Sequence, residues 1–566
     1  MKPPRPLRMT FGKRARKDTI AGVVLGVESV PDGLALGVLA GVNPLAGLYG
    51  YLFGMVGGAV ATSTPILAVQ VTGATALIVA DTHLSRFSDP ERALFTLSIL
   101  AGLFMIAAGV LKLGRLLRFV SSAVMVGFIA GIGVNTVLGQ LGNFTGFESD
   151  ASNRPLRTLD LLAHIWQVHL PTFVVGIVTL LLIIALMRTF LRALGMVVAI
   201  IIGSGLTYVL DLQGYTVATV GDVAGDTLGL PLPALPTLGV VAELLVPALA
   251  IAFVGLVQGA GIATAFPDPA GKRANPSRDF IAQGIGSVIS GLFRGMPASA
   301  SMSATALNAQ AGAQTRASLF IAGGVMTAIM LLAGNLVSFV SFPSLAALLM
   351  VVGFGTIRPP LIMHTIRSGT LQATVMIATF VLTIVMPVHF AVLLGVAFAV
   401  IIFVVEQSHH LKVRRLQLDG GTFFREVDPP REVPSGEVVI LQPYGNLFFA
   451  SAAALREQLP RVRSHSQDSV VILRLRGIDD LGVSVSKILV EYSQKLAAKD
   501  CRLIVNGGEL LFKQMLRSGA LREIGLDNFF MSGEWQGKTL VKANVVAQAW
   551  VDARIAARAD EGSQNE

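Results

Sequence analysis

Two short apolar segments, far apart in the chain, decide the architecture. The first contains Thr72-Gly73-Ala74-Thr75-Ala76-Leu77 and the second contains Met302-Ser303-Ala304-Thr305-Ala306-Leu307, so both hold the tetrapeptide Ala-Thr-Ala-Leu. Each segment (residues 64–81 and residues 297–312) opens with a proline-containing stretch, which we expect to be extended, and continues with small residues. A helix that crosses a bilayer needs ~20 mostly apolar residues. We therefore expect two short, broken crossings here.

The composition assigns most of the chain to a membrane. Of 566 residues, 53% are hydrophobic and only 14% are Asp, Glu, Lys or Arg, whereas an average soluble domain is about 25% charged. This excludes a soluble enzyme for most of the chain, and it also excludes a disordered protein. The single cysteine, Cys501, excludes an intramolecular disulfide, and no Cys/His cluster points to a metal site. We expect no metal and no cofactor.

The distribution of charge divides the chain into a membrane part and a soluble part. Residues 1–405 hold 23 Lys and Arg and 15 Asp and Glu, and the much shorter remainder holds 21 and 20. Because the soluble part is balanced in charge, nucleic acid is not an expected partner. The expected domains are a basic cytoplasmic N-terminus (1–17), a membrane domain (18–406), a linker (407–429), a soluble domain (430–556) and a disordered tail (557–566).

Apolar segments and positive charges predict the number of crossings. Twelve segments approach the length of a spanning helix, and the two short ones bring the number to fourteen. With the N-terminus inside, most Lys and Arg fall in loops expected inside, and the outside loop 212–240 contains none, although residues 82–92 and Arg294 are exceptions. We therefore expect a multi-pass protein of the plasma (inner) membrane with both termini cytoplasmic. Seven crossings in each half invert the second half relative to the first.

The short helices are candidates for an anion site. Backbone left unpaired at membrane depth must face protein or a cavity, so the helix N-termini would share one point near the midplane. Each N-terminus offers free N–H groups and about half a positive charge, which together bind an anion without Lys or Arg. Paired short segments in inverted halves are typical of a transporter's central site; the alternative is two re-entrant or merely short core helices. The candidate substrate-binding residues here are Thr72, Gly73, Ala74, Thr75, Ala300, Ser301, Met302 and Ser303.

Two carboxylates lie inside an expected span. Glu28 and Asp32 are four residues apart and share one helix face if Pro31 leaves the geometry intact. A charge in the bilayer core costs ~3 kcal/mol or more, so such residues usually have a function. We expect Glu28 and Asp32 to couple a proton to transport, with Asp32 also near the substrate; the alternative is a hydrogen bond to a neighbouring helix. Gln258, in the eighth segment, either bridges substrate and backbone or joins helices.

The chain resembles the SulP family of anion transporters, the sulfate permease group that includes prestin and pendrin in animals. The resemblance extends from Lys17 to about Val551 and rests on motifs that occur together in order. These motifs are Asp18-Thr19-Ile20-Ala21-Gly22, Val30-Pro31-Asp32-Gly33-Leu34-Ala35, Leu39-Ala40-Gly41-Val42-Asn43-Pro44-Leu45-Ala46-Gly47-Leu48-Tyr49, Gly295-Met296-Pro297 and Thr305-Ala306-Leu307-Asn308-Ala309-Gln310-Ala311-Gly312. The resemblance implies a polytopic α-helical membrane protein with a 7+7 inverted repeat of core and gate domains, elevator-like alternating access, a homodimer and a cytoplasmic STAS domain. It also implies a substrate between the third and tenth helices, with help from the first and eighth.

Departures from the family pattern bear on the substrate and the coupling ion. Many members carry an arginine after the serine of the tenth helix, where this chain has Ala304. The site therefore lacks that cation, and the helix N-termini must supply more of the attraction for the anion. Many have glutamine at the position of Asp32 and an acid at the position of Gln258. In some bicarbonate carriers that acid helps to bind sodium, so its replacement by an amide speaks against sodium and favours protons.

The expected function is secondary active transport of a small inorganic or organic anion across the lipid bilayer. Proton-coupled symport of a carboxylate or dicarboxylate such as fumarate is the leading prediction. The alternatives are a bicarbonate, sulfate or chloride transporter or exchanger, an anion channel, or a structural membrane motor. An enzyme or a primary pump is not expected, because the sequence has neither a nucleophile–base constellation nor a Gly-x-x-x-x-Gly-Lys-Ser/Thr loop.

The soluble tail alternates strand and helix patterns. Residues 437–441, 469–475 and 502–505 read as strands, with a helix over 483–496. This alternation predicts an α/β domain, and the domain resembles a STAS domain. In related bacterial regulators a hydroxyl in the turn is phosphorylated, whereas this turn reads Asp479-Asp480-Leu481-Gly482. We therefore expect no phosphorylation switch there, and folding, dimer contacts or partner binding remain as roles.

Overall fold

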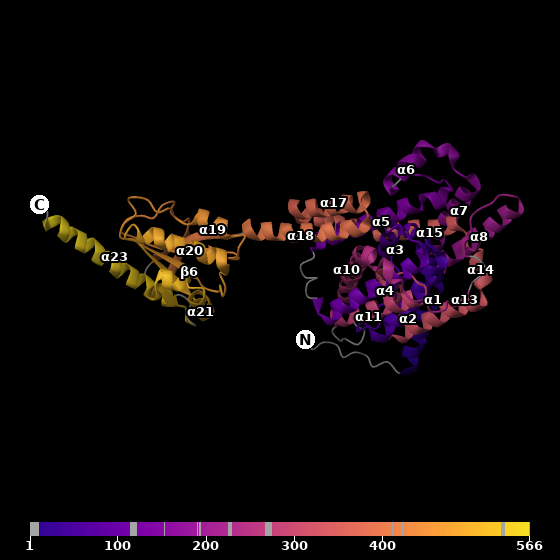
Figure 1. Ribbon diagram of the computed structural model, residues 1–566, viewed down its shortest axis with the longest axis horizontal. Helices are drawn as coiled ribbons and strands as arrows, with labels where there is room; N and C mark the ends of the chain where they lie inside the picture. Colours follow the sequence, from indigo (N-terminus) through magenta and orange to yellow (C-terminus); the bar gives the residue numbers. More distant parts are fainter. Residues whose placement is uncertain are drawn as a thin grey trace. The chain divides into compact units, whose positions relative to one another are not determined.

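The computed structural model divides the chain into two compact units, Met1–Ala399 and Val400–Glu566 (Figure 1). In the described part, the first unit is helical apart from two short strands, and the second contains a six-stranded sheet. The boundary agrees with the rise in charged residues along the sequence. The described residues are 11–113, 121–151, 153–189, 191, 194–224, 229–266, 274–409, 411–419, 423–533 and 538–564.

The helices of the first unit form two bundles. In bundle one, α1 packs on α2 and α13, while α11 packs on α2 and α4. Bundle one consists of α1 (Phe11–Leu39), α2 (Pro44–Ala61), α3 (Gly73–Asp81), α4 (Pro90–Val110), α10 (Val241–Ala265), α11 (Pro276–Leu292), α12 (Met302–Gln310) and α13 (Ala317–Leu332). In bundle two, α5 packs on α15 and α17, while α7 packs on α8 and α15. Bundle two consists of α5 (Ser122–Thr145), α6 (Arg154–Ala163), α7 (Leu170–Met187), α8 (Leu194–Leu212), α15 (Phe342–Thr356), α16 (Pro359–Ser368), α17 (Thr370–Val385) and the first part of α18 (Val388–His409). From Val400 on, α18 belongs to the second unit.

Short elements connect these helices. They are η1 (Leu84–Arg86), η3 (Ile165–Gln167), α9 (Val220–Ala224), η4 (Leu238–Val240) and α14 (Gly334–Ser338).

Local sequence explains how α2 starts and how closely it packs. Pro44 occupies its first turn, where a missing N–H has no cost, and the Asn43 side chain accepts a hydrogen bond from a backbone N–H of that turn. Gly47 lets α2 approach α1 closely, because a Cβ at this position would lie 2.1 Å from the carbonyl oxygen of Gly33. The motif that carries these residues therefore specifies a tight helix pair.

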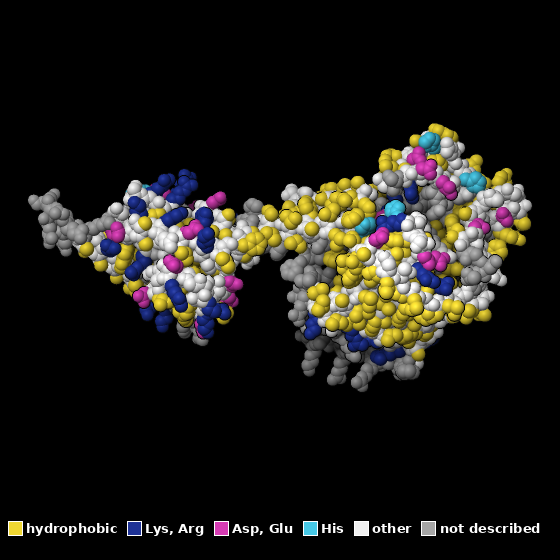
Figure 2. Space-filling model, in the orientation of Figure 1, with side chains coloured by type: hydrophobic (Ala, Val, Ile, Leu, Met, Phe, Trp, Pro, Cys, Tyr) yellow, Lys and Arg dark blue, Asp and Glu magenta, His cyan; other side chains and the backbone are white. Residues whose placement is uncertain are grey.

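The first unit has the helices of a membrane protein. Among the described residues, eight helices are long and apolar enough to cross a bilayer, and three shorter apolar helices accompany them. Figure 2 shows hydrophobic side chains covering much of the surface of this unit, while charged side chains are spread over the second unit. Length and composition do not determine which helices cross, so the fourteen crossings stay a prediction.

The second unit is an α/β domain built on one mixed sheet. Its strand order is β4-β3-β5-β6-β7-β8, in which β5 to β8 run parallel and β3 pairs antiparallel with both β4 and β5. The strands are β3 (Lys412–Asp419), β4 (Phe423–Val427), β5 (Val438–Tyr444), β6 (Val470–Leu475), β7 (Arg502–Gly507) and β8 (Phe529–Met531). One face packs on α19 (Ala452–Gln458), α20 (Gly482–Ala497), α21 (Glu509–Arg517) and α22 (Ala520–Ile524), with η5 (Leu526–Asn528) before β8, and the other face packs on α23 (Lys538–Gln564).

Two expected boundaries of this domain are wrong. The expected linker, 407–429, holds β3 and β4, so the sheet begins before residue 430. The alternation of Leu416 and Leu418 with polar residues was the signal for a strand. The expected disordered tail, 557–566, is helical as far as Gln564, because α23 continues through residues with high helix propensity such as Ala and Arg.

Candidate functional site

The two short segments meet in bundle one as a pair of antiparallel strands. In β1 (Val69–Gln70) and β2 (Ser299–Ala300), Val69 lies opposite Ala300 and Gln70 lies opposite Ser299, and all four residues are buried. α3 follows β1, and α12 follows β2. Because the strands are antiparallel, the helices leave the pair in opposite directions with their N-termini toward each other. This is the arrangement of extended stretch and short helix that the sequence predicts.

Both short helices begin with a hydroxyl cap. The Thr72 hydroxyl accepts from the Thr75 N–H (3.3 Å), and the Thr75 hydroxyl accepts from the Thr72 N–H (2.8 Å), so the two residues cap each other. The Ser301 hydroxyl accepts from the Ala304 N–H (3.3 Å). In each helix, two N–H groups then remain without an intrahelical acceptor. These are the N–H groups of Gly73 and Ala74 in α3 and of Met302 and Ser303 in α12.

The candidate residues differ in exposure. The Thr75 and Ala300 side chains are fully buried, and Ser301 is nearly so. Gly73, Met302 and Gln258 are half-buried, and Ser303 is exposed. The start of α12 therefore has both a buried cap, Ser301, and an accessible hydroxyl two residues later, on Ser303.

Ser299 connects the two helix starts with α10. Its hydroxyl oxygen lies 3.4 Å from the Thr72 hydroxyl oxygen and 3.4 Å from Oε1 of Gln258, to which it donates. On the next residue, the N–H of Ala300 donates to Oε1 of Gln283 on α11 (3.0 Å). The structure thus brings Gln258 and Thr72 together through a residue that the sequence analysis did not name.

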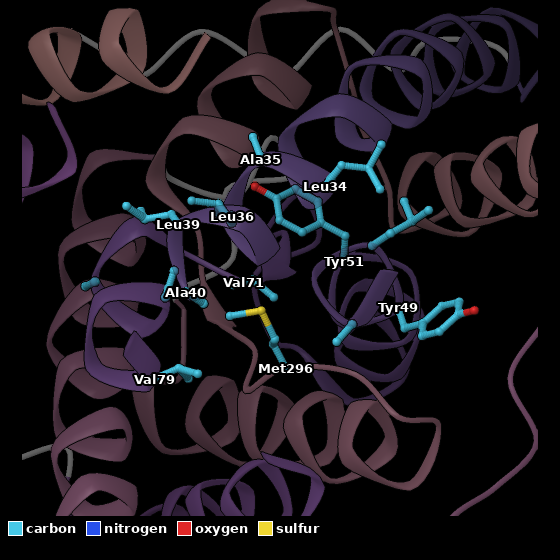
Figure 3. Packing of buried hydrophobic residues seen from close by; sticks show 14 of the residues in the cluster. Leu34, Ala35, Leu36, Leu39, Ala40, Tyr49, Tyr51, Val71, Val79 and Met296 are labelled. Atoms are coloured by element: carbon cyan, nitrogen blue, oxygen red, sulfur yellow. The ribbon is translucent and has the colours of Figure 1, made fainter. Parts of the chain in front are cut away.

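The paired carboxyl groups of α1 lie beside this bundle interior. Glu28 is buried, and its side chain interacts with that of Asp32. Oδ1 of Asp32 is buried and has no hydrogen-bond partner among the described residues. Figure 3 shows the Tyr51 side chain extending from α2 past Leu34 toward Ala35 of α1, and its phenol interacts with both carboxyl groups.

Two further buried carboxylates give a useful contrast. Asp279 accepts hydrogen bonds from three consecutive residues, 62–64, and Asp18 accepts from Gln314 and Thr315. Both groups hold a turn and have their acceptors occupied. The Glu28–Asp32 pair has fewer such partners, and this leaves a buried acceptor for a proton or another donor.

A large cavity lies at the C-terminal end of α3, away from Thr72 at its start. Its volume is about 2010 Å³, and it is lined by the C-terminal ends of α1, α3 and α5 and by the start of α6. Asp81 and Arg154 border it, together with Asp211 and Asp222. None of the candidate site residues is among the described residues that line it.

Sequence reasoning missed several residues of the site. Tyr51, Gln283 and Ser299 lack a signal of their own, because a lone aromatic, amide or hydroxyl in an apolar helix is commonplace. Gln70 was also missed, although its amide donates to the buried Ser29 hydroxyl (2.8 Å) and so ties β1 to α1. The paired short segments could have drawn attention to both neighbouring strands.

Two family models match this chain, one over its helical part and one over its C-terminal domain. The model of the sulfate permease family matches residues 16–379, and that of the STAS domain matches residues 431–533. A putative sulfate transporter of Bacillus subtilis, YvdB, is 24% identical over 537 residues, which cover 92% of this chain and 96% of the relative.

Two solved structures extend the comparison to the fold. The structure of SLC26A9 covers 97% of this chain and 92% of its own, with a TM-score of 0.83 at 15% identity. The transmembrane domain of a cyanobacterium bicarbonate transporter, BicA, covers 69% of this chain and 98% of its own, with a TM-score of 0.59 at 26% identity.

Proposed function

Because the chain belongs to the sulfate permease family, we propose that it transports a small carboxylate, with a C4-dicarboxylate such as fumarate as the first candidate, by proton symport. As a member of this family, the protein is an anion transporter. The proposal of proton symport depends mainly on one observation. This is the head-to-head arrangement of α3 and α12 in the same bundle as a carboxyl pair on α1, of which Glu28 and Oδ1 of Asp32 are buried.

The helix N-termini supply the binding energy for the anion. The free N–H groups of Gly73, Ala74, Met302 and Ser303 point along their helix axes, and each N-terminus adds a partial positive charge. A planar dicarboxylate has an acceptor group at each end, so one carboxylate can bind at each helix. Thr72, Ser301, Ser303 and Gln258 would add hydroxyl and amide donors around it.

Glu28 and Asp32 are the proposed proton site. Two carboxyl groups that interact in a buried setting are hard to ionise together, so a proton shared between them would compensate one charge of an incoming dianion. Asp32, with its unpartnered Oδ1, would contact the substrate side, and Glu28 would carry the proton. Transport would follow alternating access, with bundle one moving against bundle two in an elevator-like manner.

The same proposal includes the placement of the chain. We propose fourteen crossings in two inverted halves, both termini in the cytoplasm, a location in the plasma (inner) membrane and a homodimer. Regular alternation of basic and non-basic loops supports the orientation. The dimer is inferred from the family resemblance.

Proteoliposomes test the proposal directly. The purified protein is reconstituted with an internal pH dye, and fumarate, sulfate, bicarbonate, chloride and nitrate are each added outside. Fumarate should acidify the lumen and accumulate when the outside is more acidic. Saturable uptake of sulfate or bicarbonate without proton movement would refute symport of a carboxylate. Unsaturable anion current would instead indicate a channel.

A further inference from the structure

Asp81, at the C-terminus of α3, connects bundle one with bundle two. Its Oδ1 lies 2.9 Å from Nη2 of Arg154 on α6, and its Oδ2 accepts a hydrogen bond from the N–H of Val388 at the start of α18 (2.6 Å). The pair is largely shielded, with Arg154 16% and Asp81 11% exposed at the side chain. Both partners of this carboxylate therefore come from the other bundle.

The position of Asp81 is unfavourable within its own helix. A carboxylate at a helix C-terminus faces the negative end of the helix dipole, whereas the start of α18 presents the positive end of another. The favourable electrostatic interactions of the Asp81 carboxylate thus depend on Arg154 and on the α18 N-terminus. They exist only while the two bundles keep this relative position. A residue chosen for the stability of α3 alone would be a cation or neutral here.

The helix that carries this contact also carries the candidate anion site. α3 has nine residues, so its ends are about 13 Å apart at 1.5 Å per residue, and a helix this short moves as one body. Thr72 lies at one end and Asp81 at the other. Asp81 and Arg154 also border the 2010 Å³ cavity, so water can reach both groups when they separate.

We propose that Asp81 is a positioning residue for transport. Its bonds to Arg154 and to the Val388 N–H hold α3 against bundle two in one state of the cycle, and they break when bundle one carries the site away. This inference rests on the proposed function, because alternating access is what requires the bundles to move.

Reversible cross-linking tests this role. The Cys501→Ser background removes the single native thiol, and Asp81→Cys is combined with Arg154→Cys or, in a second variant, with Val388→Cys. A bifunctional methanethiosulfonate joins the two thiols in proteoliposomes. Uptake of whichever anion the wild type transports should be lost on cross-linking and restored by reductant, while the purified cross-linked protein should still be stabilised against heat by that anion.

A pair within bundle one is the matched control. Asp18 accepts from the Thr315 hydroxyl at 2.6 Å, so Asp18→Cys with Thr315→Cys places the same cross-link between parts that move together. This variant should keep its uptake after cross-linking. If the cross-linked Asp81 variants also keep theirs, the positioning role is refuted although the protein transports; if the wild type takes up no anion, the proposed function itself fails.

A double-mutant cycle provides an independent measurement. Asp81→Asn, Arg154→Gln and the double variant are compared by the maximal rate and KM of uptake. If the two residues act as one contact, the double variant should lose no more rate than the worse single variant. Fully additive losses would show that the pair does not operate as a unit and would overturn the proposal.

Discussion

The hydroxyl oxygen of Thr72 lies 3.4 Å from that of Ser299, 227 residues away in the sequence. Thr72 caps α3, and Ser299 lies in the strand that leads into α12. The two halves of the membrane unit therefore meet where two helix N-termini converge. An anion between them would be attracted by both dipoles, so the proposed site needs no lysine or arginine to hold a negative charge.

The caps of these helices should matter for affinity. Ser301→Ala removes the acceptor for the Ala304 N–H, which should cost about 1 kcal/mol of stability and raise the KM for uptake, because the helix start becomes less ordered. Ser121 caps α5 in bundle two and provides the control. Ser121→Ala should lower the temperature of unfolding similarly with an unchanged KM, and an equal rise in KM for both variants would argue against a site at α12.

Bulk at the start of α12 should block transport. Ser303 is exposed and its N–H lacks an intrahelical acceptor, so Ser303→Trp should abolish uptake without unfolding the protein, whereas Ser303→Ala should retain most of it. Uptake by proteoliposomes and the thermal unfolding of the purified variants measure the two effects. Wild-type transport by Ser303→Trp would place the substrate in a different cavity.

The sequence predicts the two short helices better than it predicts the interior around them. The small and hydroxylated residues near Thr72 and Ser301 predict helix starts, because Ser and Thr are preferred caps and small residues permit close approach. The hydrogen-bond partners of a buried carboxylate cannot be predicted in this way, because nothing local in the sequence distinguishes Asp279 from Asp32. Asp279 holds a turn through several hydrogen bonds, whereas Asp32 has a buried oxygen without a partner among the described residues. Such differences arise from residues distant in sequence.

The orientation of the chain can be tested with one engineered thiol. In the Cys501→Ser background, Asp222→Cys should react with a membrane-impermeant maleimide added outside intact cells, because the loop 212–240 is proposed to be extracellular. Arg278→Cys, in the first turn of α11 and proposed to be inside, should react only after the cells are opened. Labelling of residue 222 solely in opened cells would reverse the proposed topology.

The corrected domain boundary changes how the soluble domain should be removed. A truncation that ends at residue 429 keeps β3 and β4 but removes β5, which pairs with β3, and so leaves an open sheet edge that invites aggregation. A truncation that ends at His409 removes the whole sheet. We expect the second form to be monodisperse in size-exclusion chromatography and to keep the wild-type KM, while the first aggregates.

The domain boundary and the tail show where sequence patterns mislead. Lys412–Asp419 was expected within a linker, yet it forms a strand whose Val413 and Leu416 are buried on opposite faces of the sheet, in two different hydrophobic clusters. Polar residues after 556 suggested disorder, yet α23 continues as a helix to Gln564. Its first part packs on the sheet through Leu540 and Val551, and its last part contains residues with high helix propensity such as Ala and Arg. For the strand, long-range packing decides what composition alone leaves open.

The coupling ion is the sharpest test of the proposed mechanism. Glu28→Gln keeps the shape of a protonated carboxyl group, so the variant should still bind fumarate and exchange it across the bilayer. It should not accumulate fumarate in response to an acid step outside, because no proton can bind and leave at this position. Asp32→Asn should instead raise the KM, because Asp32 has the unpartnered oxygen next to the proposed substrate.

An exposed acid provides the control for this comparison. Asp222→Asn makes the same change of carboxylate to amide in a loop outside the site, and it should keep both exchange and accumulation. The two activities are measured in the same vesicles, by labelled fumarate with and without internal fumarate and by the pH dye. Full pH-driven accumulation by Glu28→Gln would show that Glu28 carries no proton, and Asp32 or the buried His389 of α18 would then be the next residue to test.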